Sequence, residues 1–242
     1  MPKIRFSPNT ERTKALDPHP TPAKMHTPKW YANAPKFSGV DGSSNDFMDH
    51  IKSENGMHLT YKLCIPFLDP LISGYMITLP TTIIVANAVD NNGKPYKKVF
   101  WNTEEPPIDM QSEFVIHGLP VPEGFYSQPY RWATQWKIET PSGYSAVFTH
   151  PFNRTDLPFH TLTGIVDTDK HPNSLLFPFF IKESFEGEIP AGTPIVQVLP
   201  FKREPWSSET TNSFQPTYST DIVKQTFIKT YKKKFWSRKE YK

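Results

Sequence analysis

Apolar and polar residues alternate most regularly between Tyr130 and Glu139. One side of this segment carries Tyr130, Trp132, Thr134, Trp136 and Ile138. The other side carries the mostly polar residues Arg131, Ala133, Gln135, Lys137 and Glu139. A period of two residues is typical of a β-strand with one buried and one solvated face. The pattern therefore predicts one continuous strand over this segment.

Short apolar runs that end at Pro or at turn residues indicate further strands. These runs are Tyr61–Phe67, Gly74–Leu79, Thr82–Val89, Lys97–Trp101, Glu113–His117, Tyr144–Phe148, Leu175–Ile181 and Ile195–Phe201. Asp90–Gly93 and Pro141–Gly143 are strong turn signals, so each predicts a hairpin between its neighbouring runs. Together these elements predict a mainly β fold, a compact sandwich or barrel of the β-clip or jelly-roll type.

The two ends of the chain differ from this β-rich body, which we place at residues 28–206. Residues 1–27 contain five prolines and few large apolar groups, so we expect an extended arm that orders only against a neighbour. Residues 207–219 are expected to be a linker. Residues 220–242 contain no Gly or Pro, and Ile228, Tyr231 and Phe235 follow helical spacing, which predicts a basic amphipathic helix.

Composition narrows the class of protein. The chain has 242 residues with 26 prolines and 14% aromatic residues. Dispersed proline disfavours a helical bundle, and the many aromatic side chains disfavour a fully disordered chain. The net charge is +3, but the segment 224–242 holds eight Lys or Arg residues and one Glu. That segment therefore carries +7, and the rest of the chain carries −4.

The basic C-terminal segment has three open interpretations. It could contact nucleic acid, lie on an anionic surface, or dock its apolar stripe on the body or on a neighbouring subunit. Docking is the interpretation we favour, because Phe235 and Trp236 would otherwise remain exposed. The candidate interaction residues at the two ends are Trp30, Tyr31, Phe227, Tyr231, Lys232, Lys233, Lys234, Phe235 and Trp236.

Several features of the sequence indicate where in a cell or particle the protein is located. Cys64 is the single cysteine, so no disulfide can form within the chain. We see no signal-peptide pattern at the N-terminus and no apolar stretch near the roughly 20 residues of a membrane-spanning helix. We therefore expect a location in a host cytoplasm or in a virion.

The densest polar region extends from His150 to His171. It contains three histidines and three aspartates, together with Arg154: His150, Asp156, His160, Asp167, Asp169 and His171. Imidazole and carboxylate groups on adjacent strands could bind zinc or iron, and the candidate ligands are His150, His160, Asp169 and His171. The alternative is that the aspartates lie in turns and the histidines have no metal. Our preferred expectation is that no cofactor is bound.

Part of the same region resembles the dUTPase and dCTP deaminase superfamily. The resemblance lies in Gly164–Asp169 (GIVDTD) and in Ile189–Leu199 (IPAGTPIVQVL), about 40 residues with the strand between them. It implies a β-clip fold, with Asp167 as the acidic residue at a strand end and with Gly192 and Gln197 in the closing hairpin. Arg154 would then contact phosphate. The candidate catalytic residues of this interpretation are Asp167, Arg154 and His160.

A broader resemblance covers Trp30 to Trp206. The phrases PKWYANAP, PSGYSAVFTHPFNRTDLPF, TGIVDTD and IPAGTPIVQVLPFKREPW are similar to those of a family of uncharacterised phage and bacterial proteins. This resemblance implies a phage-type origin. We therefore expect a non-enzymatic structural virion protein, or an assembly or binding module, that contacts itself or other virion subunits. The alternative is a dUTPase-like or metal-dependent enzyme acting on a nucleotide or another small substrate.

Overall fold

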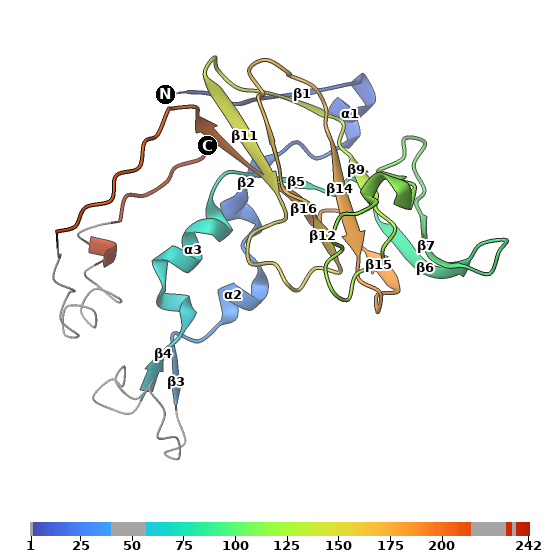
Figure 1. Ribbon diagram of the computed structural model, residues 1–242, viewed down its shortest axis with the longest axis horizontal. Helices are drawn as coiled ribbons and strands as arrows, with labels where there is room; N and C mark the ends of the chain where they lie inside the picture. Colours follow the sequence, from blue (N-terminus) through green and yellow to red (C-terminus); the bar gives the residue numbers. More distant parts are fainter. Residues whose placement is uncertain (1, 40–56, 214–230, 234–235) are drawn as a thin grey trace. The chain divides into compact units, whose positions relative to one another are not determined.

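The computed structural model describes residues 2–39, 57–213, 231–233 and 236–242. It divides the chain into two compact units, which we describe separately (Figure 1). The first unit consists of Met1–Ala23, Gly74–Glu204 and Lys242, and the second consists of Lys24–Ser73 and Pro205–Tyr241. The expected body at 28–206 is therefore split, because the part before Gly74 belongs to the second unit.

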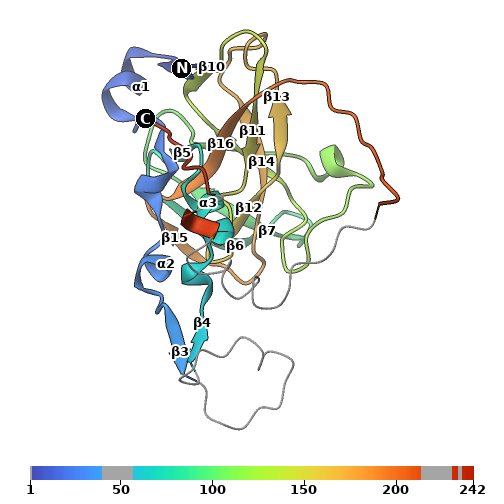
Figure 2. The ribbon, with the colours of Figure 1, turned by 90° about the vertical axis from the view of Figure 1, so that its left-hand side faces the viewer.

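The first unit is built from antiparallel sheets, which confirms the predicted mainly β class. A five-stranded sheet has the order β13 (Gly164–Val166), β11 (Tyr144–Thr149), β16 (Pro194–Lys202), β5 (Tyr75–Thr78) and β2 (Thr21–Pro22). A four-stranded sheet has the order β12 (Phe159–Thr161), β14 (Leu176–Ile181), β9 (Tyr130–Ala133) and β8 (Ile108–Met110). Within the described residues no sheet closes into a barrel, and the arrangement is sandwich-like (Figure 2).

Two smaller sheets complete this unit. One has the order β15 (Gly187–Ile189), β6 (Ile83–Val89) and β7 (Pro95–Phe100). Here β6 and β7 form the hairpin predicted around Asp90–Gly93. The other small sheet pairs β1 (Arg5–Pro8) with β10 (Trp136–Glu139). The turn predicted at Pro141–Gly143 joins β10 to β11, but the hairpin predicted there is wrong, because β10 pairs with β1 whereas β11 pairs with β13 and β16.

Aromatic rings fill the core of the first unit. Trp132 and Phe179 come from neighbouring strands and stack with centroids 3.6 Å apart and planes at 4°. Phe159 meets Trp132 edge to face at 4.9 Å. The buried indole of Trp132 also donates a hydrogen bond from Nε1 to the hydroxyl of Thr161 at 3.0 Å. This bond satisfies the polar atom of the tryptophan in an apolar environment.

The N-terminal segment differs from the extended arm that we expected at 1–27. Strand β1 pairs with β10 in the register Arg5 to Glu139, and β2 pairs with β5. Between them, the short helix α1 (Glu11–Leu16) begins at Thr10, whose side chain accepts a hydrogen bond from the backbone N–H of Thr13. This segment is ordered because its own chain supplies the sheet edges to which it adds.

Two of the strands predicted in the first unit differ from the structure: one is interrupted and the other is a helical turn. The continuous strand at Tyr130–Glu139 is interrupted after Ala133, and its halves β9 and β10 belong to different sheets. Its alternation is nevertheless real, since all five residues on the predicted apolar side are buried. Glu113–His117 is not a strand: Glu113–Ile116 forms the 3-10 turn η4, where the hydroxyl of Ser112 accepts a hydrogen bond from the N–H of Phe114.

The second unit contains short helices and one small hairpin. Its described elements include η1 (Ala23–His26), which begins at the last residue of the first unit, α2 (Lys29–Asn33), β3 (Phe37–Gly39), β4 (Met57–Leu59), η3 (Tyr61–Leu63) and α3 (Ile65–Ile72). The strand predicted at Tyr61–Phe67 is therefore wrong, because Pro66 lies in the first turn of α3, where its missing N–H costs nothing. Tyr31 is buried and its hydroxyl donates to the carbonyl of Lys62 at 3.2 Å, whereas Trp30 is exposed.

The C-terminal helix predicted over 220–242 is not present where the chain is described. Residues 231–233 form a single π turn, and residues 236–242 are neither helix nor strand. Phe227, Lys234 and Phe235 lie outside the described residues. Trp236 and Lys239 instead contact the carboxylate of Asp69 in α3, at 3.0 Å from the indole Nε1 and 2.5 Å from the ammonium. Among the described residues we find no helix long and apolar enough to span a membrane.

Candidate functional site

The residues between His150 and His171 separate into small groups. The first group contains His150 and His160, whose rings lie 4.8 Å apart at an angle of 34°. His150 Nδ1 accepts a hydrogen bond from the N–H of Thr161 at 3.3 Å, so its Nε2 carries the proton and donates to the carbonyl of Arg154 at 3.0 Å. Burial lowers the pKa of His150 to about 4 and also lowers the pKa of His160. Both rings are therefore neutral at pH 7.

The candidate catalytic residues Arg154 and Asp167 have different partners. Arg154 forms a bidentate ion pair with Asp156, with nitrogen–oxygen distances of 2.8 and 2.9 Å. Asp167 accepts a hydrogen bond from the hydroxyl of Ser145 at 2.7 Å and lies 3.2 Å from Arg203. The catalytic interpretation requires a free arginine that faces Asp167 across a substrate. The arrangement of these two residues does not support that requirement.

Arg203 organises the second group. It follows β16 directly and donates to both carboxylate oxygens of Asp169, to the hydroxyl of Ser145 and to the carbonyl of Tyr144. The backbone N–H of Gly143 also donates to Asp169 at 2.8 Å. Hydrogen bonding by Arg203 lowers the pKa of Asp169 to about 2, with a smaller contribution from Gly143. These contacts tie the end of β16 to the β10–β11 turn and to the loop after β13.

The candidate metal ligands do not gather around one point. Asp169 is held by Arg203, His171 contacts the side chain of Asn173, and His150 and His160 lie beside each other. Throughout the described residues, no three side chains of the His, Cys, Asp or Glu types are placed to hold a metal ion. The structure gives no support to the metal site proposed from the sequence.

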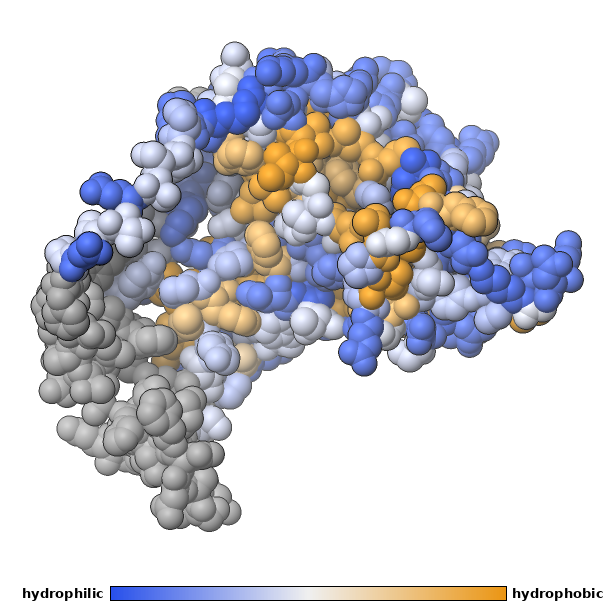
Figure 3. Space-filling view, in the orientation of Figure 1, coloured by the Kyte–Doolittle hydropathy of each residue, from blue (hydrophilic) through white to orange (hydrophobic). Residues whose placement is uncertain are grey.

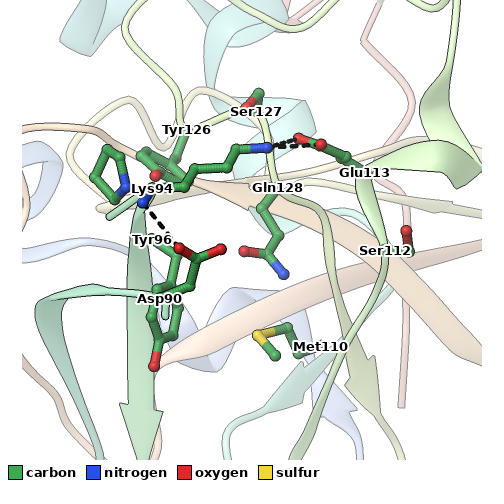
Figure 4. A pocket seen from close by; sticks show the side chains of 10 residues that line it. Asp90, Lys94, Tyr96, Met110, Ser112, Glu113, Tyr126, Ser127 and Gln128 are labelled. Carbon is green, nitrogen blue, oxygen red and sulfur yellow. Dashed lines mark hydrogen bonds and ion pairs between the residues drawn. The ribbon is translucent and has the colours of Figure 1, made fainter. Parts of the chain in front are cut away.

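The structure reveals a hollow that the sequence analysis did not find. It has a volume of about 330 Å³ and lies between the turn of the β6–β7 hairpin and the segment 110–128 (Figure 4). The side chains drawn there are those of Asp90, Lys94, Pro95, Tyr96, Met110, Ser112, Glu113, Tyr126, Ser127 and Gln128. Lys94 crosses from the hairpin to Glu113 at the start of η4, with nitrogen–oxygen distances of 2.5 and 2.6 Å.

A second, more apolar hollow lies beside the outer face of the β6–β7 hairpin. Its volume is about 430 Å³, and its lining includes Ile84, Phe100 and Trp101. Ile84 and Phe100 are directly opposite each other in the sheet register and are 46% and 44% exposed. Trp101 follows in the chain and is 38% exposed. We call these three residues the hairpin patch.

Lys97 is a further residue that the sequence analysis missed. It is 2% exposed, yet its ammonium has three oxygen acceptors: Asn87 Oδ1 at 2.6 Å and the carbonyls of Glu183 and Phe185 at 2.7 and 2.8 Å. These contacts fasten the loop before β15 to the hairpin. A lysine in a strand beside a second lysine is normally solvated, so the local sequence gives no signal of this role.

Comparison with known proteins assigns no family. No family model matches the chain, and no curated protein matches it significantly. The resemblances described from the sequence therefore remain predictions.

Proposed function

We propose that this protein is a non-enzymatic assembly and binding module of phage type, which associates with further copies of itself through the hairpin patch. The observation that carries this proposal is the exposure of Ile84, Phe100 and Trp101 around one hollow. Aromatic side chains that gather on a surface are typical anchors of protein–protein contacts. Figure 3 shows that apolar residues also reach the surface at other places on the visible face.

The groups suited to catalysis support the same proposal, because their polar contacts are used within the fold. Arg154 is paired with Asp156, and both Asp167 and Asp169 are paired with Arg203. His150 uses both ring nitrogens in hydrogen bonds to the backbone. Such contacts stabilise turns and strand ends, and they leave these groups without a common substrate space.

The residues beside the hairpin patch favour a protein partner whose surface combines apolar groups with charges of both signs. Lys98 lies on the same face of the sheet as Phe100, and its ammonium is 5.1 Å from the centre of that ring. Glu188, in the neighbouring strand β15, is exposed and lies opposite Ile84. A patch with apolar residues at its centre and charges of both signs at its edge can pair with a second copy of itself.

Sedimentation velocity of the full chain over a range of concentrations tests the proposal. We expect wild-type protein to self-associate and the variant Phe100→Ser to shift this equilibrium at least tenfold toward monomer. Ile165→Ser is the matched control, because Ile165 is 65% exposed on the edge strand β13, away from the hairpin. A monomer at all concentrations, or equal shifts for both variants, would overturn the proposed self-association.

A further inference from the structure

We propose that the hollow between the β6–β7 turn and the segment 110–128 binds a neutral saccharide. This binding site goes beyond the proposed assembly function, and none of the residues that line it lines the hollow of the hairpin patch. The hollow has a volume of about 330 Å³, and an adjoining hollow of about 420 Å³ shares Lys94, Pro95, Tyr126 and Ser127 with it. Both volumes lie in the range of small-molecule sites, which is about 300–1,000 Å³.

Neutral hydrogen-bonding groups belong to the residues that line this hollow. Within the described residues, the hydroxyls of Tyr96, Tyr126 and Ser127 have no hydrogen-bond partner in the chain. Gln128 donates from its amide nitrogen to the carbonyl of Gln111 at 3.2 Å, which leaves its amide oxygen as an acceptor. Hydroxyl and amide groups of this kind can both donate to and accept from the hydroxyls of a sugar.

Apolar surfaces lie beside these polar groups. The rings of Tyr96 and Tyr126 line the hollow, and so does Met110, which is 54% exposed. Figure 4 shows Gln128 in the space between Asp90 and Ser112, with Met110 below it. A sugar ring presents C–H groups on its faces and hydroxyls at its edge, so it matches a site in which aromatic rings alternate with polar groups.

The charge of the hollow argues against an anionic ligand. Asp90 and Glu113 outweigh Lys94, and the adjoining hollow adds Glu123 and Glu183. Burial raises the pKa of Tyr126, Lys94 lowers it, and the carboxylates of Glu113, Glu183 and Asp90 raise it further. A phosphate or carboxylate group in this hollow would meet the carboxylates of Asp90 and Glu113 against the single ammonium of Lys94, which disfavours an anionic ligand.

Two carboxylates of the hollow, those of Glu113 and Asp90, already accept hydrogen bonds within the chain, which disfavours a basic peptide as the ligand. Both oxygens of Glu113 accept from Lys94. Asp90 Oδ1 accepts from the backbone N–H groups of Asn92 and Lys94, each at 2.8 Å. The hydroxyls of Tyr96, Tyr126 and Ser127 and the amide oxygen of Gln128 keep neutral hydrogen-bonding capacity, which a neutral polyhydroxyl ligand can satisfy.

Saturation-transfer NMR on the full chain tests this site, with cellobiose, maltose, lactose and N,N′-diacetylchitobiose as probes. We expect transfer to at least one of these disaccharides and none to glucuronic acid. Tyr126→Phe keeps the ring and removes one hydroxyl, so affinity should fall about fivefold. Tyr144→Phe is the matched control, because Tyr144 lies in β11 outside the hollow, and it should leave affinity unchanged.

The outcomes separate this site from the assembly proposal. Absence of transfer to all four disaccharides would overturn the saccharide site, as would equal affinity in wild type and in Tyr126→Phe. Binding of an octalysine peptide that Asp90→Asn abolishes, without any saccharide response, would show that the site takes basic peptides instead. Self-association is measured separately by sedimentation, so either proposal can fail while the other stands.

Discussion

The guanidinium of Arg203 contacts both carboxylate oxygens of Asp169, at 2.9 Å from Nη1 and 2.5 Å from Nη2. The two residues lie 34 positions apart in the chain, and together with Gly143 they join three segments of the first unit. Because this contact lowers the pKa of Asp169 from 3.8 to about 2, the ionised carboxylate stabilises the folded state.

Asp169→Asn should lower the free energy of unfolding at pH 7 and also change its dependence on acid. The folded-state pKa lies below the ordinary value, so the stabilisation is present above pH 3.8 and is lost as the pH falls toward 2. Urea unfolding at several pH values between 2 and 5 measures this dependence. An acid dependence in the variant equal to that of wild type would contradict the assignment.

His150→Gln should alter a different pH range. Burial lowers the pKa of His150 from 6.5 to about 4, so the unfolded chain takes up a proton before the folded chain does. Stability in wild type should therefore fall by about 3 kcal/mol as the pH is lowered from 6.5 to 4. Urea unfolding of the variant should show a smaller fall over this range, and an unchanged fall would exclude His150 as its source.

Gly74→Ala should destabilise the first unit by about 3 kcal/mol or more. Gly74 has a φ of +74°, and an added Cβ would lie 2.1 Å from the carbonyl oxygen of Val198 in β16. Gly93→Ala is the control, because its φ is +75° but an added Cβ there meets no atom within 4 Å. Thermal unfolding compares the two, and we expect the control to lose only about 1 kcal/mol. Equal losses would refute the proposed clash.

Lys97→Met should cost about 3 kcal/mol of unfolding free energy. Methionine fills similar space but leaves Asn87 Oδ1 and the carbonyls of Glu183 and Phe185 without their donor. Lys98→Met, at the exposed neighbouring position, should change stability by less than about 0.5 kcal/mol. Chemical denaturation distinguishes the two variants. A loss in Lys97→Met as small as that of the control would show that these contacts contribute little.

The sequence predicted the β6–β7 hairpin because its signal is local: Asp90–Gly93 contains both the turn residues and the left-handed glycine that this hairpin requires. Pro141–Gly143 correctly predicted a turn, but the strands that it joins, β10 and β11, lie in different sheets and form no hairpin. The alternation at Tyr130–Glu139 predicted the correct buried face. Its interruption was not predictable, because β10 pairs with β1 at the far N-terminal end of the chain.

Other features depended on contacts that local sequence does not encode. The apolar run at Tyr61–Phe67 has the composition of a strand, yet α3 begins there at Ile65, with Pro66 in its first turn. The carboxylates and histidines at 150–171 are close in sequence, but Arg203 engages Asp167 and Asp169, whereas Asp156 is paired with Arg154. The two hollows each combine separate segments of the chain, so no single motif indicates them.

On the proposed function, the hairpin patch becomes buried when copies of this chain associate. Hydrogen–deuterium exchange of the full chain, at low and at high protein concentration, tests it most directly. We expect exchange to slow with concentration in peptides covering Ile84 and Phe100–Asn102, while peptides covering the exposed edge strand β13 remain unchanged. Exchange independent of concentration at the patch, or slowing confined to another surface, would contradict the proposed assembly.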